Sequence, residues 1–284
     1  MFARACRTGL PAARVSAFSR LWLDGKGTRS LTFADVRMKS QPAKSFAPLI
    51  PPQAHLIPHP DKDLSEDAYI ISPDGTLLGV ADGVGSWSNV GVNTADYSTS
   101  ILKHTQEFLQ NNPNAHLAEA VAYAYDRNDK ENVPGSSTLC LAHLKGRELH
   151  ALNLGDSGFM IIRNGKIICR TKDQHHSFNY PYQLGKGGDT LDKAHIWHSV
   201  LQMGDMIVMG TDGFFDNLYP EEILDVIAKS ASEKIAWNLG FAAFVASCSA
   251  QRNTPFGERV ATQTEEIWSG GKKDDITVLV TIVR

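Results

Sequence analysis

Four aspartates in this sequence stand at the ends of apolar segments that have the composition of buried strands: Asp82, Asp156, Asp212 and Asp274. The first three follow such a segment and the fourth precedes one. Because neighbouring antiparallel strands place the end of one beside the start of the next, these acids can converge at one edge of the sheets. Carboxylates that lie close together repel one another unless cations or shared protons are present. The spacing therefore predicts a cation-binding cluster.

The residue types around these acids indicate which cation would bind. No histidine or cysteine is interleaved with them, and hard oxygen ligands favour Mg²⁺ or Mn²⁺ over zinc. Glycine adjoins three of the acids, in Asp82-Gly83, Gly155-Asp156 and Asp212-Gly213. Glycine lets the backbone approach a ligand or offer it a carbonyl. An ordinary Asp-Gly turn is the alternative at any one position, and its recurrence at strand ends favours the ligand interpretation.

The elements that must position these acids are predicted from turn residues and hydrophobic periodicity. Apolar runs predict strands at 68–72, 76–81, 137–144, 148–154, 159–163, 166–170, 206–210 and 276–283. Apolar residues that recur at three and four predict helices at 94–110, 117–125, 220–229 and 233–250. The first two strands form a hairpin, and short links make the four strands between 137 and 170 an antiparallel meander. Strands and helices in blocks predict an α+β layered domain rather than a doubly wound parallel sheet.

Charge is divided unevenly along the chain. The formal net charge is −3, but the first 40 residues hold eight Lys and Arg against two acids, while residues 41–284 hold 20 against 29. An acidic body argues against a nucleic-acid-binding domain, a metal-dependent nuclease included. No stretch approaches the roughly 18 apolar residues needed to span a bilayer, so no transmembrane segment is predicted.

The N-terminus has the composition of a targeting sequence. Residues 1–23 contain four arginines, no acid and dispersed apolar side chains, which is typical of a transit peptide. We expect residues 1–40 to direct mitochondrial import, with a chloroplast address or a plain basic tail as alternatives. Six prolines between 41 and 60 predict a segment without regular helix, either a linker or an arm that follows the surface of the domain. One domain is predicted over 61–284.

Five motifs occur in order along this domain: Ser65-Glu66-Asp67-Ala68-Tyr69, Val80-Ala81-Asp82-Gly83-Val84-Gly85, Gly155-Asp156-Ser157-Gly158, Thr211-Asp212-Gly213-Phe214-Phe215-Asp216 and Asp274-Asp275-Ile276-Thr277. Together they resemble the metal-dependent PPM (type 2C) serine/threonine protein phosphatases, most closely the mitochondrial PTC-seven branch. The resemblance covers about residues 61 to 284. It implies a four-layer α-β-β-α sandwich of two mainly antiparallel sheets flanked by helices, with a two-metal site at one end of the sheets.

The resemblance also implies a set of ligands for two Mn²⁺ or Mg²⁺ ions. Asp82 would bridge both ions. Glu66 and the Gly83 carbonyl would complete one site, and Asp212 and Asp274 would complete the other. Two divalent ions in such a site activate water for in-line attack on a phosphoryl group, so no covalent nucleophile is needed.

Other positions are implied with more specific roles. Asp156 and Asp216 would hold a weaker third ion, and Asp67 would position the attacking water. Lys62 stands where many relatives have a phosphate-binding arginine, so it is either a phosphate ligand or a solvated surface lysine. Val84 stands where many relatives have a histidine, which leaves the proton donor to the leaving oxygen unassigned.

Several polar residues permit two interpretations. Asp275 replaces the usual asparagine and would either strengthen cation binding or face solvent. His175 and His176 lie in a polar and aromatic stretch, which is either a flap that contacts phosphopeptide or a plain surface loop. His195 and His198 are expected before a strand, as edge residues.

The function implied is that of a metal-dependent phosphatase in mitochondria, with the matrix as the expected location. Its substrates would be phosphoserine and phosphothreonine proteins of mitochondria, ubiquinone-biosynthesis proteins among them. A phosphatase for small phosphometabolites and a catalytically silent phosphoprotein-binding module are the alternatives. Retention of Asp82, Asp212 and Asp274 argues against the silent module, because it has no chemical need for the full ligand set.

Overall fold

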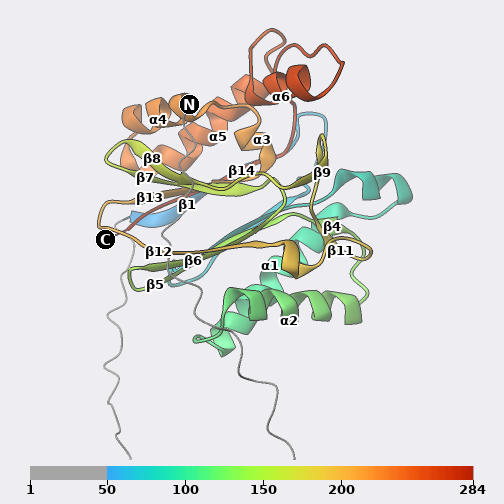
Figure 1. Ribbon diagram of the computed structural model, residues 1–284, viewed down its shortest axis with the longest axis vertical. Coiled ribbons are helices and arrows are strands. Elements are labelled where there is room, and N and C mark those ends of the chain that lie inside the picture. Colours follow the sequence, from blue (N-terminus) through green and yellow to red (C-terminus); the bar gives the residue numbers. More distant parts are fainter. Residues whose placement is uncertain (1–49, 284) are drawn as a thin grey trace, which may run out of the picture. The chain divides into compact units, whose positions relative to one another are not determined.

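The computed structural model describes residues 50–283 (Figure 1). These residues belong to a single unit of the fold. The predicted transit peptide and the first part of the predicted linker lie outside the described residues. Among the residues described, no helix is long and apolar enough to cross a membrane.

Two five-stranded antiparallel sheets form the centre of the fold. Sheet I has the order β12-β6-β5-β3-β2, with β2 Asp67–Ile71, β3 Leu77–Asp82, β5 Leu139–Lys145, β6 Glu148–Leu154 and β12 His195–Val200. Sheet II has the order β1-β14-β13-β7-β8, with β1 Ile50–Ile57, β7 Gly158–Arg163, β8 Lys166–Arg170, β13 Met206–Gly210 and β14 Ile276–Ile282. Every neighbouring pair in both sheets is antiparallel.

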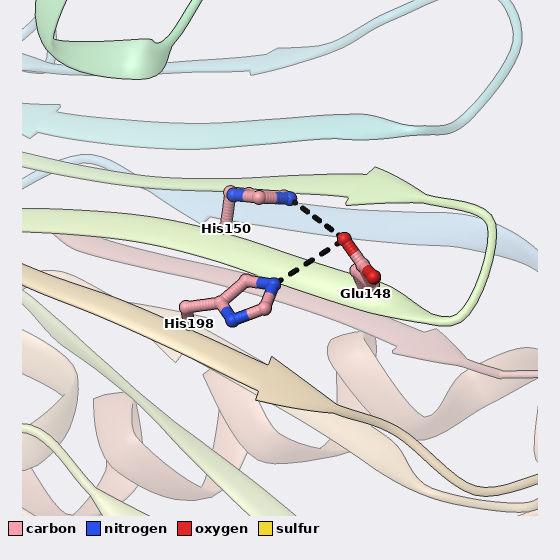
Figure 2. Close-up of side chains that lie close together, drawn as sticks. All are labelled: Glu148, His150 and His198. Atoms are coloured by element: carbon pink, nitrogen blue, oxygen red, sulfur yellow. Dashed lines mark hydrogen bonds and ion pairs between the residues drawn. The ribbon is translucent and has the colours of Figure 1, made fainter. Parts of the chain in front are cut away.

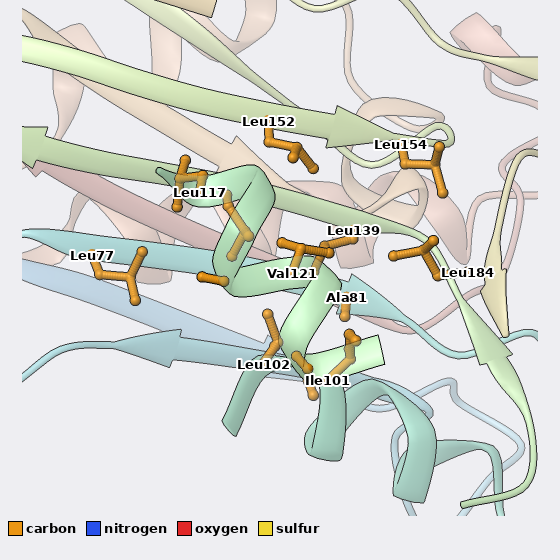
Figure 3. Close-up of a cluster of buried hydrophobic side chains, with 14 of the residues drawn as sticks. Leu77, Ala81, Ile101, Leu102, Leu117, Val121, Leu139, Leu152, Leu154 and Leu184 are labelled. Atoms are coloured by element: carbon orange, nitrogen blue, oxygen red, sulfur yellow. The ribbon is translucent and has the colours of Figure 1, made fainter. Parts of the chain in front are cut away.

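Helices cover the outer face of each sheet. Helices α1 (Thr94–Asn111) and α2 (Leu117–Lys130) pack on sheet I, and α4 (Pro220–Lys229) and α5 (Ile235–Ser247) pack on sheet II (Figure 1). Between the helices and sheet I, Ile101, Leu102 and Val121 pack against strand residues such as Leu139 (Figure 3). Each such buried aliphatic side chain contributes about 1.5–3 kcal/mol. The predicted α+β four-layer sandwich is confirmed.

Short elements connect these layers. The short strands are β4 Ser136–Ser137, β9 His175–Ser177, β10 Tyr180–Pro181 and β11 Leu184–Gly185. The short helices are η1 Gly85–Val90, η2 Leu191–Lys193, α3 Asp212–Phe215, η3 Ser232–Lys234 and α6 Pro255–Gln263. Strands β9 and β10 pair with each other, and β11 pairs with β4.

The proline-rich segment is a strand over part of its length, so the predicted linker is wrong for residues 50–57. These residues form β1, which pairs with β14 at the edge of sheet II, and the fold therefore begins before Asp61. The register shifts between Ile50 and Gln53, at the point where two prolines stand. Proline cannot donate to a ladder but is tolerated at an irregular sheet edge, and this is why proline content alone was misleading.

The four strands predicted as one antiparallel meander over residues 137–170 belong to two different sheets. Strands β5 and β6 belong to sheet I, whereas β7 and β8 belong to sheet II, so residues 155–157 cross from one sheet to the other. Gly155 has φ +102°, and a Cβ there would lie 2.6 Å from the Tyr182 carbonyl oxygen. Only glycine fits this position. The crossing places Asp156 between the two sheets instead of in a hairpin turn.

Candidate metal centre

Three of the predicted acids converge at one end of the sandwich. Asp82 ends β3, Asp156 lies in the crossing between β6 and β7, and Asp212 begins α3 directly after β13. One carboxylate oxygen of each lies within 4.8 Å of those of the other two. Sheet I supplies the first aspartate, sheet II supplies the third, and the crossing supplies the second. The convergence expected from strand ends therefore occurs between two sheets.

A lysine that the sequence analysis did not single out lies among the remaining acids. Lys272 Nζ is 2.9 Å from Asp274 Oδ2 and 3.1 Å from Asp216 Oδ2, and it also pairs with Asp212. Its side chain is 13% exposed. Burial alone would lower the pKa of Lys272, but the three carboxylates raise it well above its usual value. A fixed positive charge thus occupies the side of the cluster that Asp212, Asp216 and Asp274 form.

Asp67 is fixed by strand pairing of its backbone and by two threonine hydroxyls that bind its side chain. It pairs with Asp82 in the β2–β3 register, and its Oδ2 accepts hydrogen bonds from Thr211 Oγ1 at 2.8 Å and from Thr277 Oγ1 at 2.7 Å. Its Oδ1 is buried and has no hydrogen-bond partner within the described part of the chain. Burial raises the pKa of Asp67 well above its usual value, although the two hydroxyls act in the opposite direction. The carboxylate is fixed in orientation with one oxygen left for a ligand.

The electrostatics of the cluster fit a cation site. Burial, and then the charge of Asp212, raise the pKa of Asp82 well above its usual value. Burial raises the pKa of Asp156 to about 6, although a hydrogen bond from His175 opposes the change. Asp156 Oδ1, like Asp67 Oδ1, is buried and has no hydrogen-bond partner among residues 50–283. The unpartnered oxygens of Asp67 and Asp156, together with the acids that Lys272 pairs, are a donor set suited to hard divalent cations such as Mg²⁺ or Mn²⁺.

The predicted ligands from the start of the domain lie at one side of this cluster. The Glu66 carboxylate pairs with Lys62 and faces Gly85, where a Cβ would be 3.0 Å from Glu66 Oε2. A Cβ at Gly83 would lie 2.7 Å from the Glu66 carbonyl oxygen, so only glycine fits there. Lys62 is 38% exposed and engages Glu66 directly. The structure thus places Lys62 against a predicted metal ligand, and its predicted role toward phosphate stays a prediction.

Asp275 has a role that neither interpretation of the sequence included. It is buried, and its two oxygens accept hydrogen bonds from the backbone N–H of His59 at 2.9 Å and of Glu66 at 3.3 Å. Its place directly before β14 ties the segment that carries Glu66 to sheet II. A carboxylate accepts two backbone N–H groups in this way, whereas an asparagine would present one carbonyl oxygen.

Two further side chains, His175 and Arg259, contact acids of the cluster. His175 Nε2 lies 3.1 Å from Asp156 Oδ2, and the hydrogen bond to Asp156 raises the pKa of His175. Arg259, on α6, pairs with Asp216. Sequence reasoning missed Arg259 because α6 was not predicted. Lys272 could have been suspected from its position two residues before Asp274.

A cavity of about 430 Å³ adjoins the cluster on the side of His175 and Arg259. Its lining includes the cationic side chains of Arg170 and Lys172 and the ring of Phe178. His175 therefore contacts both the cavity and the acid cluster, whereas its neighbour His176 pairs with Asp189. The stretch around these histidines contains the β9–β10 hairpin and contributes to a pocket beside the aspartates, so it is more than a plain loop.

Sequence comparisons identify relatives along most of the domain. The family model described as Stage II sporulation protein E (SpoIIE) matches residues 72–284. The probable protein phosphatase 2C BIPP2C1 of Oryza sativa subsp. japonica is 42% identical over 241 residues, which are 81% of this chain and 42% of the rice protein. The protein phosphatase PTC7 homolog fig of Drosophila virilis is 33% identical over 272 residues, which are 86% of this chain and 85% of the fly protein. The chain spans less than half of the rice relative.

Structural comparisons agree with the fold. The structure of the photosystem II phosphatase PBCP matches with a TM-score of 0.77 and 32% identity, over 82% of this chain and 98% of that chain. The catalytic domain of the serine/threonine phosphatase PstP, solved with two manganese ions, matches with a TM-score of 0.61 and 18% identity, over 82% of this chain and 97% of that chain. At that identity the second match supports the fold alone.

Proposed function

The chain belongs to the PPM (type 2C) family of metal-dependent protein phosphatases, and we propose that it hydrolyses phosphoserine and phosphothreonine in proteins. The observation that carries this proposal is the convergence of Asp82, Asp156 and Asp212, with orphaned carboxylate oxygens and a buried ammonium group beside them. Mn²⁺ or Mg²⁺ ions held there would activate water and neutralise phosphoryl charge during in-line displacement.

The chain's own residues prepare this site for the reaction. We assign Asp82, Glu66, Asp212 and Asp274, with the Gly83 carbonyl, to two ions. Asp156 and Asp216 are assigned to a weaker third ion. Asp82 ends β3, an interior strand of sheet I that pairs with β2 and β5, so the sheet fixes the backbone from which its carboxylate extends. The acids come from elements of both sheets, so the site forms only when the whole sandwich is folded.

Two positioning roles follow from the contacts. The threonine hydroxyls of Thr211 and Thr277 fix Asp67 Oδ2, so Asp67 Oδ1 is directed to one place, where it can accept a proton of the attacking water. Lys272 offsets the repulsion among Asp212, Asp216 and Asp274. A divalent cation would take over that role and displace the ammonium group of Lys272. Thr211 and Thr277 act through Asp67, and Lys272 acts through the acids that it contacts, so these three are positioning residues.

The test is hydrolysis of a phosphothreonine peptide by protein lacking residues 1–40, with EDTA or with added Mn²⁺ or Mg²⁺. We expect turnover that needs metal and is lost in the Asp212→Asn variant. Asp225→Asn is a matched control, because Asp225 is an exposed acid on α4 that pairs with Lys229. Metal binding without turnover would instead indicate a silent phosphoprotein-binding module.

The cavity beside the aspartates favours a protein substrate over a small phosphometabolite. Arg170, Lys172 and Phe178 can contact the residues that flank a phosphoserine, which a phosphometabolite lacks. We expect Lys172→Glu to lower kcat/KM for an acidic phosphopeptide several-fold and to leave hydrolysis of a small aryl phosphate unchanged. An equal effect on both substrates would contradict this role of the cavity.

We further propose mitochondrial proteins, those of ubiquinone biosynthesis included, as substrates in the matrix. The support is the acid-free, arginine-containing stretch at residues 1–23 and the similarity to the PTC7 relative. The full chain with a C-terminal fluorescent tag should co-localise with mitochondria, and the same protein lacking residues 1–40 should not. Equal distribution of the two proteins would contradict this location.

A further inference from the structure

Three histidines form a row across one face of sheet I, at the end away from the aspartates. His143 on β5 stands opposite His150 on β6, which stands opposite His198 on the edge strand β12. Directly opposite residues in an antiparallel pair point to the same face. Glu148, two residues before His150, shares that face. The backbone register alone therefore brings these side chains together.

Two of the imidazoles and the carboxylate face one another closely (Figure 2). His198 Nε2 is 3.3 Å and His150 Nε2 is 3.5 Å from Glu148 Oε2, and the two rings have centroids 4.6 Å apart. The ligand atoms of all three residues lie within 4.8 Å of one another. One small ion can touch three atoms at this separation, because metal–nitrogen and metal–oxygen bonds measure about 2.0–2.2 Å.

The lysine that stands opposite Glu148 has another partner. Lys145 stands opposite Glu148 in the β5–β6 register, but its Nζ donates to the Ala115 carbonyl oxygen at 2.8 Å. The ion pairs and hydrogen bonds that the structure gives for the Glu148 side chain are those with the two imidazoles. Its oxygens, like the two imidazole nitrogens, are directed to a shared space that solvent can reach, since Glu148 is 53% and His198 54% exposed.

We propose that Glu148, His150 and His198 bind a transition-metal ion of the zinc class, at a site separate from the aspartate cluster. Two imidazoles and one carboxylate are a ligand set that Zn²⁺ favours, with water in the fourth position. Mg²⁺ and Mn²⁺ prefer oxygen, so the two centres would take different metals. Strand β6 runs from Glu148 to Leu154, and this separates the centres by about 20 Å.

The structural consequence is a link between an edge strand and its neighbour. Strand β12 is exposed at five of its six positions, and among the strands of residues 50–283 it pairs with β6 alone. An ion that joins His198 to His150 and Glu148 would hold β12 in register. Because the ion binds only the folded arrangement, zinc should stabilise the protein by mass action.

The test is titration of the whole protein with Zn²⁺ in the presence of excess Mg²⁺, which occupies the oxygen-rich centre. We expect one zinc equivalent for the unmodified chain, and the loss of that equivalent in His198→Ala. His195→Ala is the matched control, because His195 is exposed on the same strand but faces the opposite side. Equal zinc stoichiometry in the two variants, or no zinc binding by the unmodified chain, would overturn the proposal.

A second readout keeps the test independent of folding and of the proposed phosphatase activity. With Cu²⁺ as the probe, the electron paramagnetic resonance spectrum should show coupling to two imidazole nitrogens, and Glu148→Gln should weaken binding at least about tenfold. Coupling to fewer than two nitrogens contradicts the site. This outcome bears only on the Glu148 cluster, because the aspartate cluster is tested separately by hydrolysis with Mg²⁺.

Discussion

The two ends of sheet I carry clusters of opposite character. At one end, Asp82 and its partners are withdrawn from water, and the pKa values of three of the carboxyl groups are raised. At the other end, Glu148 and His198 are exposed and held near each other by the cross-strand register. The buried acids are therefore accompanied by an internal cation, Lys272, whereas the exposed residues are brought together by the backbone register of β6 and β12.

The largest expected effect is the loss of activity when an aspartate of the buried cluster is replaced. Asp82→Asn should lower metal-dependent kcat by at least about 100-fold, because a carboxylate aimed at the reacting centre is lost. The same variant should melt at an equal or higher temperature without metal, since the Asp82 carboxylate is repelled by Asp212. Peptide hydrolysis and thermal melting in EDTA measure the two effects. Near-normal turnover with a native circular dichroism spectrum would refute the site.

Lys272→Met should destabilise the metal-free protein, because the repulsion among Asp212, Asp216 and Asp274 is then no longer offset. We expect the metal-free protein to lose about 3 kcal/mol of unfolding free energy, because breaking a buried ion pair leaves uncompensated charge. Mg²⁺ should then bind more tightly, since no ammonium group must be displaced. Lys273→Met is the matched control: Lys273 is exposed and pairs with Asp61, so about 0–1 kcal/mol is expected. Urea unfolding measures the change in stability, and calorimetric titration measures the affinity for Mg²⁺. Equal effects of the two substitutions would contradict the role of Lys272 as the internal cation.

The buried end should also make metal-free stability depend on pH. The pKa of Asp156 is raised to about 6 from 3.8. A raised pKa contributes stability that is fully present below the unfolded value and is lost as pH rises through the folded value. The melting temperature in EDTA should therefore fall between about pH 4 and pH 7, and the increase caused by Mg²⁺ should grow over the same interval. A Mg²⁺ effect independent of pH would contradict the linkage.

A smaller effect is expected from the hydroxyls that orient Asp67. Thr277→Val removes the 2.7 Å hydrogen bond and should lower kcat by roughly tenfold, at a stability cost of about 1.5–3 kcal/mol for a bond to a charged group. Thr281→Val is the control on the same strand, because the Thr281 hydroxyl is buried without a partner. Thr281→Val should be neutral or stabilising. The comparison of kcat in the two variants decides whether Thr277 is a positioning residue.

The smallest effect is expected at the exposed end. Without zinc, His198→Ala should change the unfolding free energy by less than about 0.5 kcal/mol, because exposed ion pairs contribute little. Thermal melting in EDTA checks this value. A loss of several kcal/mol would mean that the two clusters do not differ in the way that their burial indicates.

Part of this architecture was readable from the sequence. The α+β class, most strands of both sheets and the aspartates at strand ends follow from local patterns, since apolar runs, turn residues and periodicity are properties of neighbouring residues. The edge strand β12, the helix α6 and the division of the meander between two sheets were not predicted. Strand β12 buries little, so it lacks an apolar pattern.

The sequence by itself determined where the acids stand along the chain and, through five ordered motifs, which family they resemble. Only the tertiary structure decided that Asp156 lies between the sheets, that Lys272 is the internal cation, and that Asp275 ties Glu66 to β14. It also decided that His150 and His198 meet, 48 positions apart in the sequence. These contacts depend on strand order and register, which are set by long-range packing of whole faces and are not encoded in any local spacing.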